Sequence, residues 1–299
     1  MDTQTNSVLQ QLNSFKRRES IRIRPLQFLK ALSIYGKTGL MVIVFFIIMS
    51  TVSVLFLGDA YSIPSGSSLE APSLSHLLGT DDLGIDILAQ ICHGALISLL
   101  VGFSSAVLAG IGGSVLGIFA GYCGGWVDRL ICGLCDIMAV IPQLPLMIVL
   151  GAFFGPSTRN IILVIAILSW VGPARIARSK VLSLRYEKYI IAAKSYGASF
   201  FHILVKHLLP RLMPVIMVST VRIISHAVVA EAGLTFLGLG DPTSKSWGVI
   251  LNRAMSFRGI YFTDFWKWWL LPTLLALTLL VLSVAWIGRD LEQITNQKL

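Results

Sequence analysis

The sequence predicts an all-α membrane protein with about six transmembrane helices. Of its 299 residues, 55% are hydrophobic and only 13% are charged, which is about half the charged fraction of a typical soluble domain. Residues 39–57 contain no charged side chain over a length that can cross a bilayer. Lysine and arginine are concentrated in alternate connections between the apolar stretches. These observations favour a multi-pass helical membrane protein over a soluble domain.

Six apolar stretches are candidates for membrane spans. They are residues 39–57, 94–120, 130–154, 160–174, 212–236 and 268–288, and the fourth has the shortest apolar run. The first stretch follows a long polar and basic segment and is too long for the hydrophobic region of a signal peptide. We therefore expect it to be the first transmembrane helix, with the segment before it in the cytoplasm.

The distribution of basic residues predicts the orientation in the membrane. Residues 1–38 hold seven lysines and arginines and residues 174–211 hold eight, whereas residues 59–93 hold none. With both termini inside, eighteen of the 24 basic residues are cytoplasmic, five are external, and Arg222 lies within a span. The net charge of +9 is thus explained by topology, and no basic domain indicates nucleic-acid binding.

These boundaries divide the chain into five parts. They are a cytoplasmic tail (1–38), a first helix (39–57), an external connection (58–93), a core (94–290) with a cytoplasmic loop (174–211), and a cytoplasmic C-terminal tail (291–299). The external connection is rich in proline, serine and glycine and should be partly irregular. The second span is rich in small residues, which allow helix backbones to pack closely in lipid.

Within the cytoplasmic loop, residues 191–210 read IAAKSYGASFFHILVKHLLP. Ala192 and Ala193 favour a helix without adding bulk, so another protein can approach the backbone. Gly197 is suited to end that helix in a left-handed conformation. Pro210 fits the first turn of a following helix. The pattern predicts a helix, a turn and a second helix, although an ordinary basic loop with no partner is the alternative.

The spacing of this segment resembles the "EAA" loop of bacterial ABC importer permeases, whose pattern is E-A-A-x3-G-x9-I-x-L-P. In that family the loop is the surface on which a separate ATPase subunit docks. The resemblance assigns the following residues to ATPase coupling: Ala192, Ala193, Gly197, His207, Leu209 and Pro210. Ile191 stands where the family has glutamate, so docking should depend less on charge at that position. Glu187, one turn earlier, is a candidate replacement, and the alternative is that it balances Arg185 and Lys188.

Other segments resemble the C-type permeases of dipeptide, oligopeptide and nickel importers. They are HLLGTDDLGID at residues 76–86, the GY-x-GG turn at 121–125, and LTFLGLG with SWG at 234–248. The family has arginine at the positions of Ile85 and Leu96. The resemblance covers residues 76–290 and implies a type I ABC importer permease fold in the cytoplasmic (inner) membrane of a bacterium or archaeon. It also implies a second homologous permease, two ATPase subunits, an external substrate-binding protein, surrounding lipid, and no cofactor.

Three ionisable residues fall within the predicted fifth span: Arg222, His226 and Glu231. Such groups are costly at membrane depth and face a water-filled path or the protein interior. Arg222 and His226 are one helical turn apart and share a face, whereas Glu231 points elsewhere. Both a pathway role and a contact with a neighbouring subunit fit this pattern.

Other functions find less support in the sequence. Gly36-Lys37-Thr38 resembles the end of a phosphate-binding loop, but Ala31 stands at the position of its first glycine. ATP would therefore be hydrolysed by partner subunits. A membrane-embedded enzyme would need clustered ionisable residues, and the five histidines are scattered. An ion channel would not need an ATPase-docking loop. Peptide is the preferred substrate, and nickel or a metal chelate is the alternative.

The four cysteines do not indicate a metal or redox site. Cys132 and Cys135 form a C-x-x-C pattern with no soluble redox fold around it, so both are expected to be packing residues. Cys92 and His93 are adjacent, and two ligands alone make a weak metal site.

Overall fold

The computed structural model describes residues 31–298, apart from the side chains of Leu57, Gln297 and Lys298. The described residues from Ser33 onward form one compact unit. Most of the predicted N-terminal tail, with six of its seven basic residues, lies outside the described residues. The described part of the chain is helical, and its only β-type pairing is a single bridge between Thr80 and Asp86.

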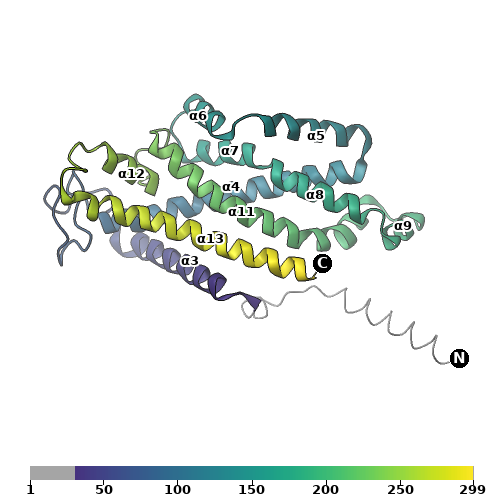
Figure 1. Ribbon diagram of the computed structural model, residues 1–299, viewed down its shortest axis with the longest axis horizontal. Coiled ribbons are helices and arrows are strands. Elements are labelled where there is room, and N and C mark those ends of the chain that lie inside the picture. Colours follow the sequence, from purple (N-terminus) through teal and green to yellow (C-terminus); the bar gives the residue numbers. More distant parts are fainter. Residues whose placement is uncertain (1–30, 299) are drawn as a thin grey trace. The chain divides into compact units, whose positions relative to one another are not determined.

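The helices follow one another through the unit (Figure 1). In chain order they are α3 (Ile34–Val52) with the π-helical turn η1 (Ser53–Leu57), α4 (Ile87–Cys123), α5 (Gly125–Val140), α6 (Gln143–Phe154), α7 (Thr158–Ser169), α8 (Val171–Leu184), α9 (Lys188–Ser195), α10 (Phe200–Ile203), the π-helical turn η2 (Leu204–Leu208), α11 (Leu209–Phe236), α12 (Trp247–Ser256), the 3₁₀ turn η3 (Asp264–Lys267) and α13 (Leu270–Lys298).

Five helical segments in the described part of the chain are long and apolar enough to cross a bilayer. They are Ile34–Phe56, Ile87–Cys123, Thr158–Leu184, Phe200–Phe236 and Asp264–Asn296. The helices α5 and α6 make a sixth span if the bent pair is counted as one. The prediction of an all-α membrane protein with about six spans is therefore confirmed.

Helix α3 begins at Ile34, before the predicted residue 39, because the C-terminal helix fixes its start. The hydroxyl of Ser33 accepts a hydrogen bond from Gly36 N at 3.2 Å, which caps the first turn. The backbone N–H and the hydroxyl of Ser33 in turn donate to the carboxylate of Asp290 at 2.7 and 2.9 Å. This contact joins residues far apart in the sequence, which local patterns do not reveal.

Helix α4 begins at Ile87, which shortens the predicted external connection of 58–93. The Asp86 carboxylate caps the helix by accepting a hydrogen bond from Ala89 N at 2.9 Å. Its first turns contain the polar residue Gln90, which is buried and donates to Asp81. The helix therefore starts before the apolar run that hydropathy detects. Its first turns can include the polar Gln90 because Asp81 accepts a hydrogen bond from it inside the protein.

The predicted third span, 130–154, is two helices rather than one. Helices α5 and α6 meet at an angle of 93°. Ile141 at the junction is extended, with φ −75° and ψ 126°. Proline disfavours the helical conformation in the residue before it, and Pro142 follows directly. The bend is therefore encoded by Pro142, although hydropathy alone treats the stretch as continuous.

The fourth span extends from Thr158 to Leu184, well beyond the predicted residues 160–174. Trp170 keeps helical backbone angles, so α7 runs on into α8. Two arginines in α8 pair with α5: Arg178 with Asp128 at 2.5 Å and Arg175 with Asp136 at 2.8 Å. The predicted loop 174–211 thus starts with helix, because its first cations are neutralised by a neighbouring helix.

The C-terminal helix α13 continues to Lys298, so the predicted tail 291–299 is helical through its described residues. The fifth span is also longer than 212–236, because α10 and η2 continue directly into α11, which has Pro210 in its first turn. Pro214 lies one turn further along the same helix.

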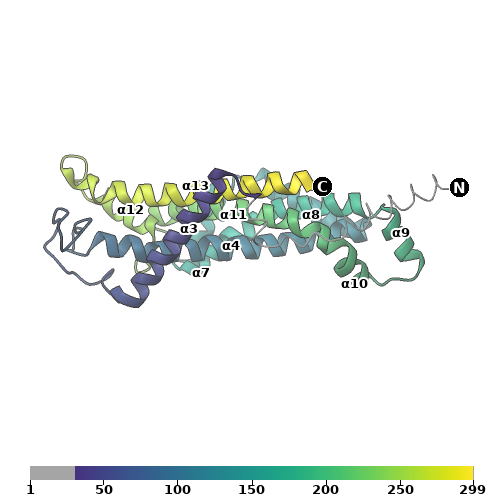
Figure 2. The same cartoon turned by 90° about the horizontal axis from the view of Figure 1, so that it is seen from below.

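Helix α4 is central to the packing and contacts α8, α11, α7 and α3. Figures 1 and 2 show it running alongside α11 and α8 for much of their length. A Cβ atom on Gly113 would collide with the carbonyl oxygen of Trp170, and one on Gly117 with that of Ala174. The small residues of the second span therefore bring α4 into backbone contact with the fourth span.

The two ends of this unit differ in character. Helix α9 and the C-terminal end of α13 lie toward one end, whereas α12 and the connection before α4 lie at the other (Figure 1). The first end contains the basic segment of the predicted cytoplasmic loop. The second contains the acidic connection, which has no lysine or arginine between residues 59 and 93.

Candidate functional site: the coupling segment and an adjacent cleft

Residues 188–208 form a coupling segment made of α9, a tight turn, α10 and η2. Gly197 has φ +78° and ends α9 in the left-handed conformation. Its N–H donates a hydrogen bond to Lys194 O at 2.9 Å, and the N–H of Ala198 donates one to Ala193 O at 3.0 Å. This pair of bonds is the Schellman arrangement, which satisfies carbonyls at a helix C-terminus. Ser199 then caps α10 by accepting from His202 N at 3.3 Å.

Buried aliphatic residues hold the coupling segment on the spans. Ile190, Ile203 and Leu208 are fully buried and belong to one apolar cluster with Val181 of α8 and Leu212 of α11. Each short element thus contributes one buried anchor. The segment is a packed structure rather than a loose loop, and a displacement of it would be passed to α8 and α11.

Aromatic and cationic side chains add to this attachment. The Lys194 ammonium lies 4.5 Å from the Tyr122 ring centre, and the Arg211 guanidinium lies 4.5 Å from that of Tyr189. Burial raises the pKa of the Tyr189 hydroxyl above its usual value. The half-buried His207 ring lies 5.7 Å from the Tyr189 ring, measured between ring centres, so His207 packs against α9.

The opposite side of the coupling segment exposes apolar side chains. They are Ile191 (50% exposed), Tyr196 (92%), Phe201 (72%) and Val205 (60%). Ala192 is exposed beside them, and Ala193 is half-buried. Large apolar side chains that are exposed on this segment are suited to a protein contact. The sequence pattern identified the alanines and the turn but not these four residues, although large apolar residues inside a basic loop were a usable signal.

The position of the missing glutamate is also clear in the structure. Ile191 is in the first turn of α9 and projects an apolar side chain. Glu187 is the N-cap residue, with extended backbone, and its side chain makes no capping hydrogen bond. Its carbonyl accepts from Ile190 N and Ile191 N. Glu187 therefore lies at the N-terminal end of α9, one position before its first helical residue.

The three ionisable residues of α11 do not form one cluster. Glu231 is fully buried, and its carboxyl accepts a hydrogen bond from Ser98 of α4 at 3.4 Å. His226 is exposed. Arg222 is also exposed and pairs with Glu292 of α13. Glu231 thus belongs to the packing between α4 and α11, whereas Arg222 borders a cleft.

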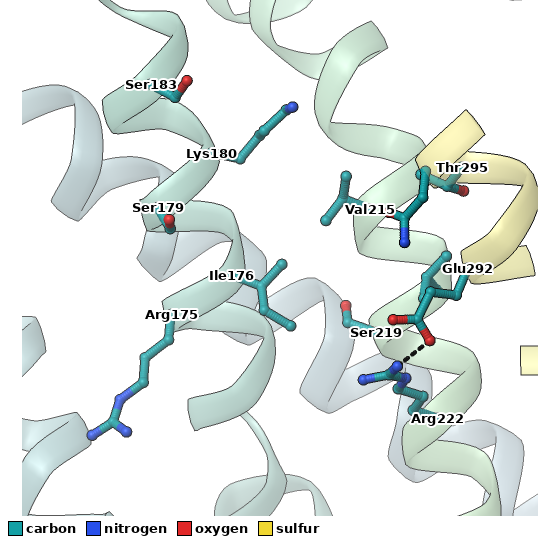
Figure 3. Close-up of a pocket in the computed structure, with 12 residues that line it drawn as sticks. Arg175, Ile176, Ser179, Lys180, Ser183, Val215, Ser219, Arg222, Glu292 and Thr295 are labelled. Atoms are coloured by element: carbon teal, nitrogen blue, oxygen red, sulfur yellow. Dashed lines mark hydrogen bonds and ion pairs between the residues drawn. The ribbon is translucent and has the colours of Figure 1, made fainter. Parts of the chain in front are cut away.

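This cleft lies between α8, α11 and α13 and has a volume of about 500 Å³. Polar residues from all three helices line it: Ser179, Lys180, Ser183, Ser219, Arg222, Glu292, Thr295 and Asn296. Figure 3 shows Lys180 on one side and the Arg222–Glu292 pair on the other, whereas Arg175 points away. The cleft is on the same stretch of α8 and α11 that leads into the coupling segment.

At the other end of the unit, a buried carboxylate organises the external connection. Asp81 is fully buried. It accepts hydrogen bonds at 2.8–2.9 Å from Leu83 N, Ile85 N and Gln90 Nε2. Arg253 of α12 pairs with Asp82 at 2.9 Å. Burial lowers the pKa of the nearby Lys245 ammonium, and repulsion from Arg253 lowers it further. The connection is thereby fixed to α12.

The described residues contain no group of three or more histidine, cysteine or acidic side chains placed to hold a metal ion. All four cysteines are free, and Cys132 contacts the Asp128 carboxylate at 3.5 Å.

Comparison with known proteins identifies the architecture. Residues 113–294, which include the coupling segment and most of the residues that line the cleft, match the family described as "Binding-protein-dependent transport system inner membrane component". The chain belongs to this family. As a binding-protein-dependent permease, it is a transport subunit and a multi-pass component of the bacterial inner membrane.

Relatives of this permease extend the similarity to most of the chain. The dipeptide transport system permease protein DppC of Alkalihalophilus pseudofirmus is 36% identical over 87% of this chain and 85% of its own length. The protein of the same name from Bacillus subtilis is 32% identical over 87% and 81%. The glutathione transport system permease protein GsiD of Pectobacterium atrosepticum is 39% identical over 62% of each chain.

Proposed function

We propose that this permease is a subunit of an ATP-driven peptide importer and forms half of its translocation pathway. Beside it we place a second homologous permease, two ATPase subunits and an external substrate-binding protein. The coupling segment is the observation that carries this proposal. Its buried side is anchored on α8 and α11, and its exposed side presents Ile191, Tyr196, Phe201 and Val205 for a partner.

The geometry supports a mechanism of coupling. Closure of the ATPase subunits would displace α9, and the buried anchors Ile190, Ile203 and Leu208 would pass this displacement to the spans. Turn η2 runs directly into α11, whose next turns border the cleft at Val215 and Ser219. ATP hydrolysis at the cytoplasmic surface would in this way change access to the pathway.

The substrate proposal rests on the named relatives. Two are dipeptide permeases and one is a glutathione permease, a name that denotes a small peptide. These names favour peptide over nickel or a metal chelate as the cargo of this chain.

Uptake in cells tests this function. Deletion of the gene should abolish accumulation of radiolabelled dialanine, and the chain supplied from a plasmid should restore it. A variant of the partner ATPase that binds but does not hydrolyse ATP should fail to support uptake. Unchanged dialanine uptake together with lost nickel uptake would contradict the peptide proposal. Failure of any ATPase to co-purify with the chain would contradict the coupling proposal.

A further inference from the structure

The cleft between α8, α11 and α13 has a composition that differs from an ordinary lipid-facing groove. Four of its lining residues carry hydroxyl groups and three are cationic, counting Arg175 at its margin. The cleft lies toward the predicted cytoplasmic ends of these helices, where its polar side chains face water or a polar ligand. Its volume of about 500 Å³ is in the range of small-molecule sites, roughly 300–1,000 Å³.

The charge inside the cleft is unbalanced. Arg175 pairs with Asp136 of α5 and points away from the cleft (Figure 3). Arg222 pairs with Glu292. Within the part of the chain that the structure describes, no carboxylate pairs with Lys180. Two cations, Lys180 and Arg222, thus face a single carboxylate, and the half-buried Lys180 is the one that lacks a counter-ion.

We infer that this cleft binds the terminal carboxylate of a peptide, with Lys180 as its counter-ion. This inference rests on the proposed function and names a site for its cargo. Lys180 supplies a compact positive charge for the carboxylate. The hydroxyl of Ser179, next to Lys180 on α8, supplies a hydrogen-bond donor beside it, and Arg222 lies across the cleft.

The location gives this site a role in release. It lies on α8 and α11 next to the coupling segment, on the side that the charge distribution places in the cytoplasm. A peptide would meet Lys180 late in its passage. Movement of α9 would alter the spacing of α8 and α11 and so weaken the site, since both helices hold the anchors of the coupling segment.

Cysteine protection tests this inference. In inside-out vesicles containing the assembled importer, Ser183→Cys would be labelled with a maleimide in a chain whose four native cysteines are alanine. A second chain that keeps only Cys123, which is exposed at the end of α4, serves as the control. At a dialanine concentration about ten times its Kd, labelling at position 183 should slow about tenfold, because labelling follows the unoccupied fraction. Labelling of Cys123 should not change.

Two comparisons identify the groups involved. Dialanine amide, which lacks the carboxylate, should give no protection. Lys180→Gln should abolish protection by dialanine, whereas Lys37→Gln, at an exposed lysine outside the cleft, should preserve it. Absence of protection by dialanine, equal protection by the amide or by inorganic phosphate, or protection that persists in Lys180→Gln would each overturn the inference.

Uptake measured in the same strains separates this inference from the proposed function. If deletion of the gene abolishes dialanine uptake but position 183 is never protected, only the peptide site in the cleft is wrong. If dialanine uptake survives deletion, the proposed function itself is wrong.

Discussion

At the scale of single residues, Gly197 has a clear conformational role. Its φ of +78° is the left-handed region, and a Cβ added there would meet no atom within 4 Å. The requirement for glycine is therefore one of backbone conformation and not of space. Gly197→Val should cost about 1–3 kcal/mol in the turn, because β-branched residues disfavour this region.

This change should weaken ATPase association and peptide uptake while leaving membrane insertion intact. Co-purification of the ATPase and uptake of dialanine measure the two effects. Gly197→Asn is the matched control, since asparagine tolerates left-handed backbone, and it should retain most activity. Normal uptake by Gly197→Val would contradict the argument for the turn.

A second prediction at this scale concerns Ile191, which replaces the glutamate of the related pattern. Because Ile191 is half exposed and the Glu187 side chain makes no hydrogen bond at the start of α9, we expect the contact with the ATPase at Ile191 to be apolar. Ile191→Ala should weaken ATPase binding about fivefold, or ~1 kcal/mol, as for a truncated interface side chain. Glu187→Ala should change it little. A larger loss in Glu187→Ala, measured by ATPase titration, would show that Glu187 has taken over the acidic contact.

At the scale of elements, the contact between α4 and the fourth span depends on glycine. A Cβ on Gly113 would strike the backbone of Trp170, which cannot move aside as a side chain can, whereas a Cβ on the adjacent Gly112 would meet nothing within 4 Å. Gly113→Ala should destabilise the protein by about 1–3 kcal/mol through overpacking. Gly112→Ala should be neutral or slightly stabilising.

Thermal unfolding of the two purified variants in one detergent measures this difference. Gly112→Ala is a matched control because both changes add one methyl group to the same helix. Equal unfolding temperatures for both variants would mean that α4 and the fourth span do not approach as closely as the structure has them.

At the scale of the whole molecule, the charge distribution predicts that the coupling segment faces the cytoplasm. In a chain without native cysteines, Ser195→Cys should resist a membrane-impermeant maleimide in intact cells and react after the cells are opened. Ser62→Cys, in the external connection, should react in both cases. Both sites are exposed, so a difference reflects sidedness. Reaction of Ser195→Cys in intact cells would reverse the orientation.

Local sequence determined much of this molecule. Apolar stretches are sufficient to predict a helical membrane protein, because backbone groups in lipid must bond within a helix. Gly197 and Pro210 are sufficient to predict the turn and the helix that follows, because each restricts the backbone on its own. The family resemblance in the coupling segment also lies in contiguous residues. These features can be predicted without knowing any contact between residues distant in the sequence.

Tertiary structure decided the rest. Two helix boundaries differ from the sequence prediction because a polar residue pairs with a residue distant in the sequence. Ser33 pairs with Asp290, and Arg178 pairs with Asp128. The sequence places Arg222 and His226 on one face and Glu231 on another, but only the fold pairs Arg222 with Glu292 and buries Glu231 against Ser98. The cleft likewise could not be predicted from the sequence, because its lining residues come from three separate helices. A hydrophobic pattern records that a residue can be buried, whereas the packing of the helices decides what it meets there.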